Sequence, residues 1–270
     1  MCPNPATPAP QIQPTVAYKV NDWLSVGAGA GLTLGYLSDK MRVESLEPGG
    51  SDGKLTLSDS DFAVQGNFGV MIEPSAKTRI GLRYLTETDL DFEDAPQVSG
   101  IGPIDINAPR LDLGVKMPQS LMAAVHHQWN GDLAVLGSVG WDEWSAFGHI
   151  KAGFDEDSGE VSTTLDADFR DTWHFGVGAE YQYQPRLLLT GGISFDTSMS
   201  SDRTRPITLP LGNLYRYGVG FKYKASDTMT YGGGFTFLWE GNLPIKETKG
   251  VEGHYHKTSI SFRSFYAMWH

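Results

Sequence analysis

The residues of this sequence whose chemistry most clearly suggests ligand binding are basic side chains on segments that alternate apolar and polar residues. Arg83 lies in the segment 78–88, and Arg216 and Lys222 lie in the segment 214–224. Each could bind a carboxylate, because charged donors make strong hydrogen bonds to carboxylates. The competing interpretation, which is favoured for any single residue, is that these charges pair with nearby acids, for example Lys222 with Glu180.

Seven histidines raise the question of a metal site or a catalytic site. His254 and His256 form a His-x-His pair, but no carboxylate or cysteine stands at ligand spacing from them. His174 could pair with Ser194, yet the sequence fixes no third group that would orient the imidazole. We therefore predict no metal site, no cofactor and no catalytic residue, and we expect that the protein is not an enzyme.

The segment Asp171–Asp196 shows which kind of element carries such side chains. One face of its first arm is apolar and aromatic, and consists of Trp173, Phe175, Val177, Ala179, Tyr181 and Tyr183. His174 and Glu180 fall on the other face, and this strict alternation indicates a β-strand. A tight turn around Pro185 leads to a second alternating arm. Arms of about ten residues with aromatics near their ends are typical of a transmembrane β-hairpin.

The composition excludes several classes of protein. No stretch of the 270 residues approaches the apolar run of a membrane helix, which needs roughly 18 residues. The net charge of −11 argues against a nucleic-acid partner, which would favour basic patches. The only cysteine, Cys2, excludes an internal disulfide and a cysteine-rich zinc site. No signal peptide is visible, so we expect a fragment or a miscalled start.

The connections between alternating segments predict an antiparallel transmembrane β-barrel in an otherwise all-β chain, with about eleven strands present. Short turns near residues 21, 75, 130, 185 and 226 alternate with long loops at 38–59, 89–118, 145–170, 197–213 and 241–256. Bacterial outer-membrane barrels have short periplasmic turns and long extracellular loops, and we expect the same sides here. Residues 1–10 are predicted to be a disordered start, and residues 11–270 a single partial-barrel domain.

The placement of charge predicts which face meets lipid. Arg83 and Lys222 lie opposite the aromatic residues, and a lipid-facing Arg or Lys at the bilayer midplane costs about 2–4 kcal/mol. The polar face is therefore expected to line the lumen. It carries four further candidate ligand-binding residues, namely His174, Leu136, Leu188 and Leu238. The faces of the last strand cannot be assigned, because Arg263 is in phase with Phe265 and Trp269.

Several segments resemble one family of outer-membrane transporters. They include PTVAYKVNDWLSVGAGAGLTLGYL (Pro14–Leu37) and EPSAKTRIGLRYLTETDLDFE (Glu73–Glu93). The most specific is MPQSLMAAVHHQWNGDLAVLGSVGWDEWSAF (Met117–Phe147), which ends in a W-[DT]-x-W-S-x-F motif. DTWHFGVGAEYQYQPRLLLTGGISFDTS and LYRYGVGFKYKASDTMTYGGGFTFL continue the match. These segments resemble the FadL/TodX family of long-chain fatty acid and hydrocarbon transporters.

The resemblance implies a 14-stranded barrel whose N-terminal segment forms a hatch in the lumen. About eleven strands here leave the hatch and about three strands absent, so the sheet is not expected to close. It also implies passive uptake of a hydrophobic ligand, such as a fatty acid or a detergent, by a monomer in outer-membrane lipid and lipopolysaccharide. Two alternatives remain open, a general diffusion porin and a structural or adhesion barrel.

Overall fold

The computed structural model describes residues 11–43, 53–94, 97–99, 106–107, 111–147, 149–156, 159–166, 168–205, 211–246 and 252–269. Within these ranges nearly all of the regular structure is β-strand, and the helix is the single turn α1 (Trp144–Phe147). None of the helical structure in the described ranges is long and apolar enough to cross a membrane. The predicted disordered start at 1–10 lies outside the described residues.

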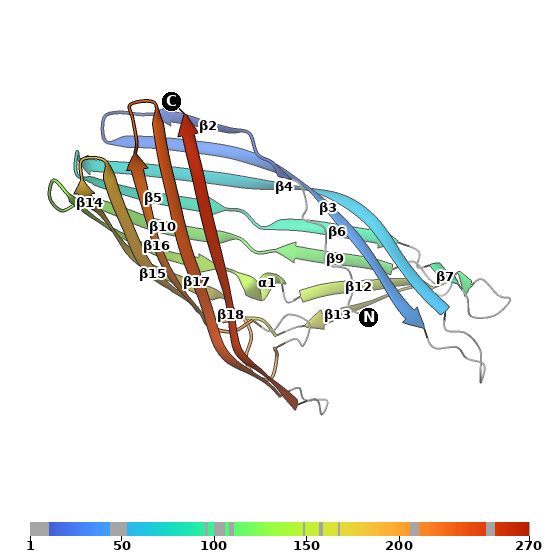
Figure 1. The fold of residues 1–270 in the computed structure, drawn as a ribbon. Coiled ribbons are helices and arrows are strands. Elements are labelled where there is room, and N and C mark those ends of the chain that lie inside the picture. The colour runs from blue at the N-terminus through green and yellow to red at the C-terminus, as the bar shows by residue number, and fades with distance from the viewer. Residues whose placement is uncertain are drawn as a thin grey trace.

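Most strands belong to one antiparallel sheet, which we call the wall (Figure 1). Its strands are β1 (Gln11–Ile12), β2 (Thr15–Lys19), β3 (Leu24–Val43), β4 (Gly53–Ser75), β5 (Thr78–Leu85), β10 (Ser120–Gln128), β11 (Leu133–Asp142), β14 (Thr172–Gln184), β15 (Leu187–Asp196), β16 (Leu214–Lys224), β17 (Met229–Lys246) and β18 (Glu252–Trp269). Two short strands, β7 (Gln97–Ser99) and β8 (Ile106–Asn107), extend it beside β4. Each successive long strand pairs with the one before it, which confirms the predicted antiparallel sheet.

The wall has two edges. The strands β1 and β2 share one edge, and β18 forms the other. Both β1 and β2 pair with β3, so together they occupy the place of one predicted strand. Among the described residues, β18 pairs only with β17. The edges of the wall are therefore β1–β2 and β18.

Short turns join the strands at one end of the wall, which we call the turn end. Two of these turns use the same device, an asparagine side chain that accepts backbone N–H groups two and three residues ahead. Asn130 Oδ1 accepts from the amides of Asp132 and Leu133, each at 2.9 Å. Asn21 Oδ1 accepts from Trp23 and Leu24 at 3.0 and 2.8 Å. The opposite end, which carries the longer connections, is called the loop end.

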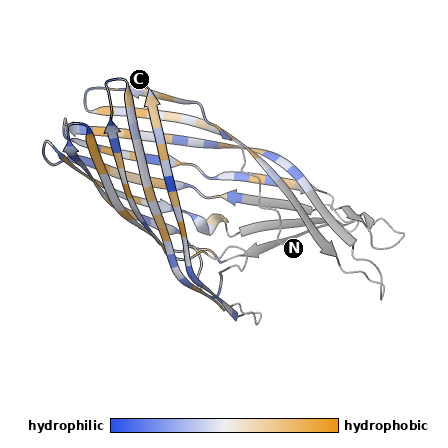
Figure 2. Cartoon of the chain, in the orientation of Figure 1, coloured by the Kyte–Doolittle hydropathy of each residue, from blue (hydrophilic) through white to orange (hydrophobic). Residues whose placement is uncertain are grey.

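Aromatic side chains form belts on one face of the wall, which we call the outer face. Near the loop end, Phe195 lies 5.0 Å from Tyr215, and Tyr215 lies 5.5 Å from Trp239, measured between ring centroids. Near the turn end, Tyr181 and Tyr183 lie 6.4 Å apart. Figure 2 shows hydrophobic and hydrophilic residues alternating along the wall strands. The two belts and the alternation have the pattern of a lipid-facing surface.

A second, four-stranded sheet lies at the loop end and contradicts two of the predicted loops. It consists of β6 (Thr88–Asp94), β9 (Leu111–Met117), β12 (His149–Glu156) and β13 (Gly159–Asp166) in the order β13-β12-β9-β6. The predictions of loops at 89–118 and 145–170 were wrong because acidic, proline and glycine residues hid short alternating stretches. Pairing these stretches satisfies their backbone groups outside the wall. The loops at 38–59 and 241–256 also shorten, since β3, β4, β17 and β18 extend into them.

This second sheet continues the wall. β6 follows β5, β9 precedes β10, β12 follows β11 through α1, and β13 precedes β14, so the neighbour order is conserved (Figure 1). Leu90 and Phe92 of β6 are buried with Ala63 of β4. A Cβ at Gly35 would lie 2.8 Å from Leu90 Cδ2 and 3.1 Å from Phe92 Cζ, which is closer than van der Waals contact. The absence of a side chain at Gly35 therefore lets β6 pack on the inner side of β3 and β4.

The register of β18 resolves the faces that could not be assigned from the sequence. Ile260, Ser264 and Tyr266 pair with Leu238, Gly234 and Gly232, which places them on the inner face. Phe265 and Arg263 pair with Gly233 and Phe235, which belong to the outer face. Arg263 is therefore a cation on the aromatic side of the wall.

Candidate functional site

A cavity of about 660 Å³ opens on the inner face of the wall, between β5 and β17. Its floor is formed largely by glycine, because Gly176, Gly178, Gly192 and Gly218 line it on three neighbouring strands. A Cβ at Gly218 would have only Thr236 Oγ1 within 4 Å, at 3.9 Å. The space exists because these positions lack side chains, and we call it the inner-face cavity.

A chain of polar side chains crosses the inner-face cavity. Arg216 Nη1 forms an ion pair with Asp196 Oδ2. Asp196 Oδ1 lies 2.9 Å from His174 Nδ1, and His174 Nε2 lies 3.2 Å from Ser138 Oγ. His174 and Asp196 are largely buried, with side chains 19% and 23% exposed. Each polar group thus has a partner in a neighbouring strand.

Other charges of the inner face are also paired. Arg79 Nε lies 3.2 Å from Glu73 Oε1. Glu180 Oε2 lies 3.8 Å from His126 Nε2. The expected pair between Lys222 and Glu180 is not formed in the described part of the chain, because the acid reaches toward β10 instead.

The structure brings some of the predicted ligand-binding residues together and separates others. His174, Arg216 and Leu136 all line the inner-face cavity. Leu238 stands opposite Arg216 in the ladder between β16 and β17. Leu188 and Lys222 face each other nearer the turn end, away from the cavity lining.

Arg83 lies apart, in a second inner-face cavity of about 410 Å³ over β2–β5 and β10. Met122 and Asn67 share this lining. Within the described ranges, Arg83 and Lys222 form no ion pair, in contrast to Arg216. Both guanidinium and ammonium groups are therefore open to an anion.

The comparisons with known proteins identify the family. The model of the "Outer membrane protein transport protein (OMPP1/FadL/TodX)" family matches residues 9–265. The chain belongs to this family. It is therefore an outer-membrane β-barrel protein of Gram-negative bacteria.

One relative and two solved structures show the extent of this similarity. The long-chain fatty acid transport protein of Escherichia coli O6:H1 is 23% identical to this chain. The match covers 88% of this chain and 60% of the length of that protein. A Pseudomonas aeruginosa FadL homologue gives a TM-score of 0.73 at 16% identity, over 96% of this chain and 66% of its own. The Ralstonia pickettii toluene transporter TbuX gives a TM-score of 0.63 at 20% identity. The match covers 96% of this chain and 67% of the transporter chain. The chain spans 40% to 60% of the length of the first curated relatives it matches.

The polar chain of this family member has the outline of a Ser–His–Asp triad, but the matching family is described as one of outer-membrane transport proteins. Ser138 on β11, His174 on β14 and Asp196 on β15 are linked one to the next by hydrogen bonds across three neighbouring strands. The carboxylate is shared with Arg216, so it neutralises a guanidinium as well as orienting an imidazole. This arrangement fixes the charge balance of the cavity and holds Arg216 in place.

Sequence reasoning missed Asp196 and Ser138, although a signal for one of them was present. His174 and Asp196 lie at equal distances along the chain from Pro185, and the hairpin turn together with the β-bulge between Gln182 and Gln184 places them opposite each other. Ser138 is brought beside His174 by the ladder between β11 and β14. The connection between these strands is long, and no turn in the sequence sets its register.

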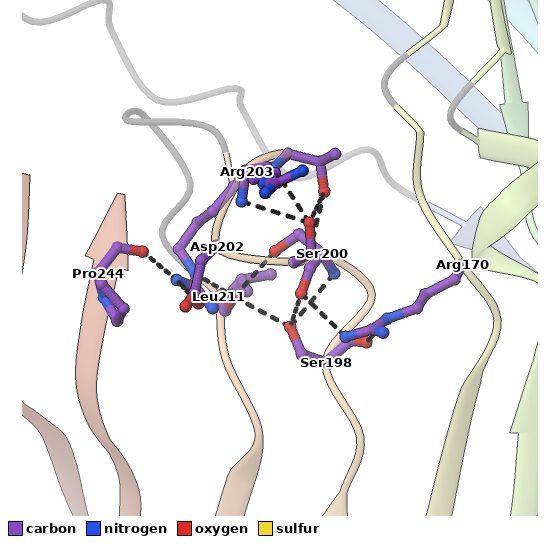
Figure 3. A network of polar contacts seen from close by, with 10 residues as sticks. Arg170, Ser198, Ser200, Asp202, Arg203, Leu211 and Pro244 are labelled. Atoms are coloured by element: carbon purple, nitrogen blue, oxygen red, sulfur yellow. Dashed lines mark hydrogen bonds and ion pairs between the residues drawn. The ribbon is translucent and has the colours of Figure 1, made fainter. Parts of the chain in front are cut away.

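The loop end of this FadL/TodX family member contains a second polar network, which we call the rim cluster (Figure 3). Arg205 is 5% exposed, and its guanidinium donates to the carbonyls of Leu211 and Pro244 and to Asp202. Arg170 donates to the carbonyl of Ser198 at 3.2 Å. The rim cluster holds the connection between β15 and β16 against β17.

The W-[DT]-x-W-S-x-F motif of the resemblance, Trp141 to Phe147, also has a structural role at the loop end. The Trp141 Nε1–H donates to Asp171 Oδ2 at 3.0 Å. Ser145 Oγ donates to Asp171 Oδ1 at 2.6 Å. The rings of Trp144 and Phe147 are 5.4 Å apart. The motif therefore fastens α1 to the start of β14.

Ionic contacts in the second sheet are weaker, because they are exposed. Lys116 Nζ lies 3.5 Å from both Asp89 Oδ1 and Glu87 Oε2. Asp89, and after it Glu87, raise the pKa of Lys116 against the opposing effect of burial. Exposed pairs of this kind contribute little to stability.

Proposed function

We propose that the full-length protein takes up hydrophobic compounds, long-chain fatty acids or aromatic hydrocarbons, by passive passage across the outer membrane. The observation that carries this proposal is the inner-face cavity, whose glycine floor leaves room behind a wall with an apolar outer face. The names of two proteins with this fold support the choice of ligand, since one is a long-chain fatty acid transport protein and one a toluene transporter. No cofactor is required, because the ligand moves down its concentration gradient.

The cations on the inner face would bind the carboxylate of a fatty acid. Arg216 is already neutralised by Asp196, so a carboxylate must compete with an existing ion pair there. Arg83 and Lys222, which lack an ion-pair partner in the described ranges, offer the carboxylate a free charge. A hydrocarbon needs none of these charges and would contact apolar side chains such as Leu136.

Three further residues complete the proposed path. His174 contributes a polar edge to the inner-face cavity beside Arg216. Leu238 and Leu188 extend an apolar surface toward the loop end and the turn end respectively, as their register shows. The path therefore alternates apolar surface with single charges, which suits an amphipathic ligand.

In the proposed orientation the turn end faces the periplasm and the loop end faces the outside. The support is the one-sided distribution of connections, since short turns lie at one end and the longer connections and the second sheet at the other. The protein would act as a monomer surrounded by outer-membrane lipid and lipopolysaccharide.

A pair of tryptophan substitutions tests the proposal. Gly218→Trp would project a large side chain into the inner-face cavity, where the space beyond a Cβ is open. Val139→Trp is the matched control, because Val139 is 40% exposed on the outer face of β11, where it pairs with Phe175. Each variant of the complete gene is expressed in a strain that lacks its own transporter, and uptake of radiolabelled oleate and of toluene is measured.

We expect Gly218→Trp to lower the uptake of oleate at least about tenfold and Val139→Trp to leave it unchanged, because only the first substitution narrows the cavity. Equal uptake by both variants, with equal amounts of protein in the membrane, would contradict the proposal. Ion conductance of the wild-type protein in a planar bilayer, without uptake, would favour a general diffusion porin. Neither conductance nor uptake would favour a structural or adhesion barrel.

A further inference from the structure

The cation of the outer face, Arg263, lies midway between the two aromatic belts. It pairs in register with Phe235 of β17. Along β17, Tyr231 and Trp239 stand on the same face on either side of Phe235 and belong to the two belts. Arg263 is therefore placed near mid-depth of the apolar band, on the side that faces lipid.

No acid of the described chain neutralises this cation. Its neighbours on the outer face are Ser261 and Phe265 on β18 and the apolar and aromatic residues of β17. Arg263 forms no ion pair or hydrogen bond within the described ranges. An ionisable residue within a membrane is costly unless it is paired, and it marks a functional site by default.

An apolar groove leads away from Arg263. A depression of about 350 Å³ is bounded by Arg263 and by Leu189, Val219, Phe221, Phe235 and Phe265. It adjoins a second depression, of about 690 Å³, that crosses β14–β16 and shares Val219 and Phe235 with the first.

The two depressions together form a groove across the five strands β14 to β18, and a charge stands at one end of it. From β14 to β18 it crosses strands spaced about 4.8 Å apart, which gives it a length of about 19 Å. Gly191 lies along it, and a Cβ there would have only the carbonyl oxygen of Gly218 within 4 Å, so the outer face is open at this position, whereas the rings of Phe221 and Phe265 cover Gly233. This shape fits one extended hydrocarbon chain better than a compact aromatic molecule.

We propose that the outer face of β14–β18 binds a long-chain carboxylate from within the bilayer, with its carboxylate on Arg263 and its chain in the groove. A guanidinium binds a carboxylate through two parallel hydrogen bonds, and such a pair carries no net charge into the hydrocarbon. The choice of a fatty acid rests on the proposed function. The existence of an anion site at Arg263 rests on the register and the groove alone.

The depth of Arg263 favours a free fatty acid over the headgroup of a membrane lipid. The apolar band of such barrels is about 25 Å tall, so mid-depth lies about 12 Å from either surface. The phosphate of a phospholipid is held at the surface by its second chain and its polar headgroup. A single-chain carboxylic acid is not held in this way and can lie across the face of the wall.

Photolabelling of the full-length protein tests the site directly. The protein is placed in phosphatidylcholine vesicles with a palmitic acid analogue that carries a diazirine at its methyl end, and the labelled peptides are mapped by mass spectrometry. The variants are Arg263→Gln and Arg263→Lys, and the control ligand is the methyl ester of the same analogue. Substitution of an outward-facing cation should not prevent folding, and the heat-dependent shift in gel mobility checks this for each variant.

We expect the free acid to label β14 or β15 in the wild type, and Arg263→Gln to lower this labelling at least about tenfold. Arg263→Lys should retain part of this labelling. Labelling by the methyl ester should be the same in the wild type and in both variants. Labelling that is equal in the wild type and Arg263→Gln, or that is confined to the inner face, overturns the proposal. Loss of labelling when phosphatidylglycerol replaces a quarter of the lipid also overturns it, because the site would then prefer a headgroup phosphate.

Uptake measured in parallel separates this inference from the proposed function. Outer-face labelling that depends on Arg263, in a protein that transports no oleate, would leave the site intact and remove the transport proposal. Transport without such labelling would do the opposite.

Discussion

Two arginines of this protein show how differently the wall and the loop end use the same side chain. Arg216 lies on the inner face of the wall, 37% exposed, and its partner is the carboxylate of Asp196. Arg205 lies in the rim cluster, its side chain 6% exposed, and bonds mainly to backbone carbonyls. The first is held by a side chain that can change partners, whereas the second is held by the main chain of two separate segments.

The difference follows from what the backbone is doing in each region. The interior strands of the wall have their carbonyls occupied by ladder hydrogen bonds, so an inner-face arginine on such a strand can find acceptors only on side chains. The connection between β15 and β16 has no ladder near Leu211, and its carbonyls need donors from elsewhere. A charge on the wall is thus available to a ligand, while a charge in the rim cluster is part of the architecture.

Removing the architectural arginine should have the largest effect. Arg205→Met leaves the carbonyl of Pro244 without this donor and the carbonyl of Leu211 with only the hydroxyl groups of Ser198 and Ser200, and we expect the free energy of unfolding to fall by about 1–3 kcal/mol. Urea unfolding of the protein in lipid vesicles measures this change. Arg203→Met, at an exposed position of the same connection, should change it by less than about 0.5 kcal/mol. Similar losses in both variants would remove the distinction between the two regions.

Separating Arg216 from Asp196 should cost less, because both side chains keep contact with water. A double-mutant cycle with Arg216→Met and Asp196→Asn should give a coupling free energy of about 1 kcal/mol. The same variants should change the uptake of oleate relative to toluene, since only oleate carries a charge. A coupling as large as the loss in Arg205→Met would show that the wall pair is architectural too.

The smallest effect is expected at the turn between β16 and β17, where Lys224 Nζ lies 3.0 Å from Asp227 Oδ1 in full solvent. The hydrogen bond from Lys224, followed by its charge, lowers the pKa of Asp227. A carboxyl group with a lowered pKa in the folded state stabilises the protein at pH values above its unfolded-state pKa of about 3.9. This stabilisation is lost as the pH falls through the folded-state pKa. Asp227→Asn should therefore slightly lower the urea midpoint at pH 7 but not at pH 2. A midpoint difference that grows on acidification would contradict this assignment.

The hairpin around Pro185 shows how much could be predicted from the sequence. Alternation placed His174 on the inner face and Trp173 on the outer face. The tight turn and the β-bulge next to it, between Gln182 and Gln184, set the register that brings Asp196 opposite His174. Both results depend only on neighbours in sequence. The predicted set of wall strands was confirmed for the same reason, since each one alternates over a length that the pattern can resolve.

The parts that could not be predicted depend on contacts between distant segments. The hydrogen bond between Ser138 and His174 needs the register of two strands whose connection includes α1, β12 and β13. The burial of Arg205 depends on carbonyl acceptors, which every residue type supplies and which leave no pattern in the sequence. The second sheet was missed because each of its strands is too short for alternation to stand out.

The outer face of the wall also shows where this protein keeps most of its hydrophobic surface. Its buried apolar residues in the described ranges are few, and the large exposed ones are spread over every wall strand. The bilayer therefore serves as the missing half of the hydrophobic core. From Tyr231 to Trp239 the apolar band measures about 27 Å along the strand, or about 20 Å once the usual strand tilt is included. The stability of this protein is thus a property of the membrane as much as of the chain, and a bilayer of matching thickness will hold it best.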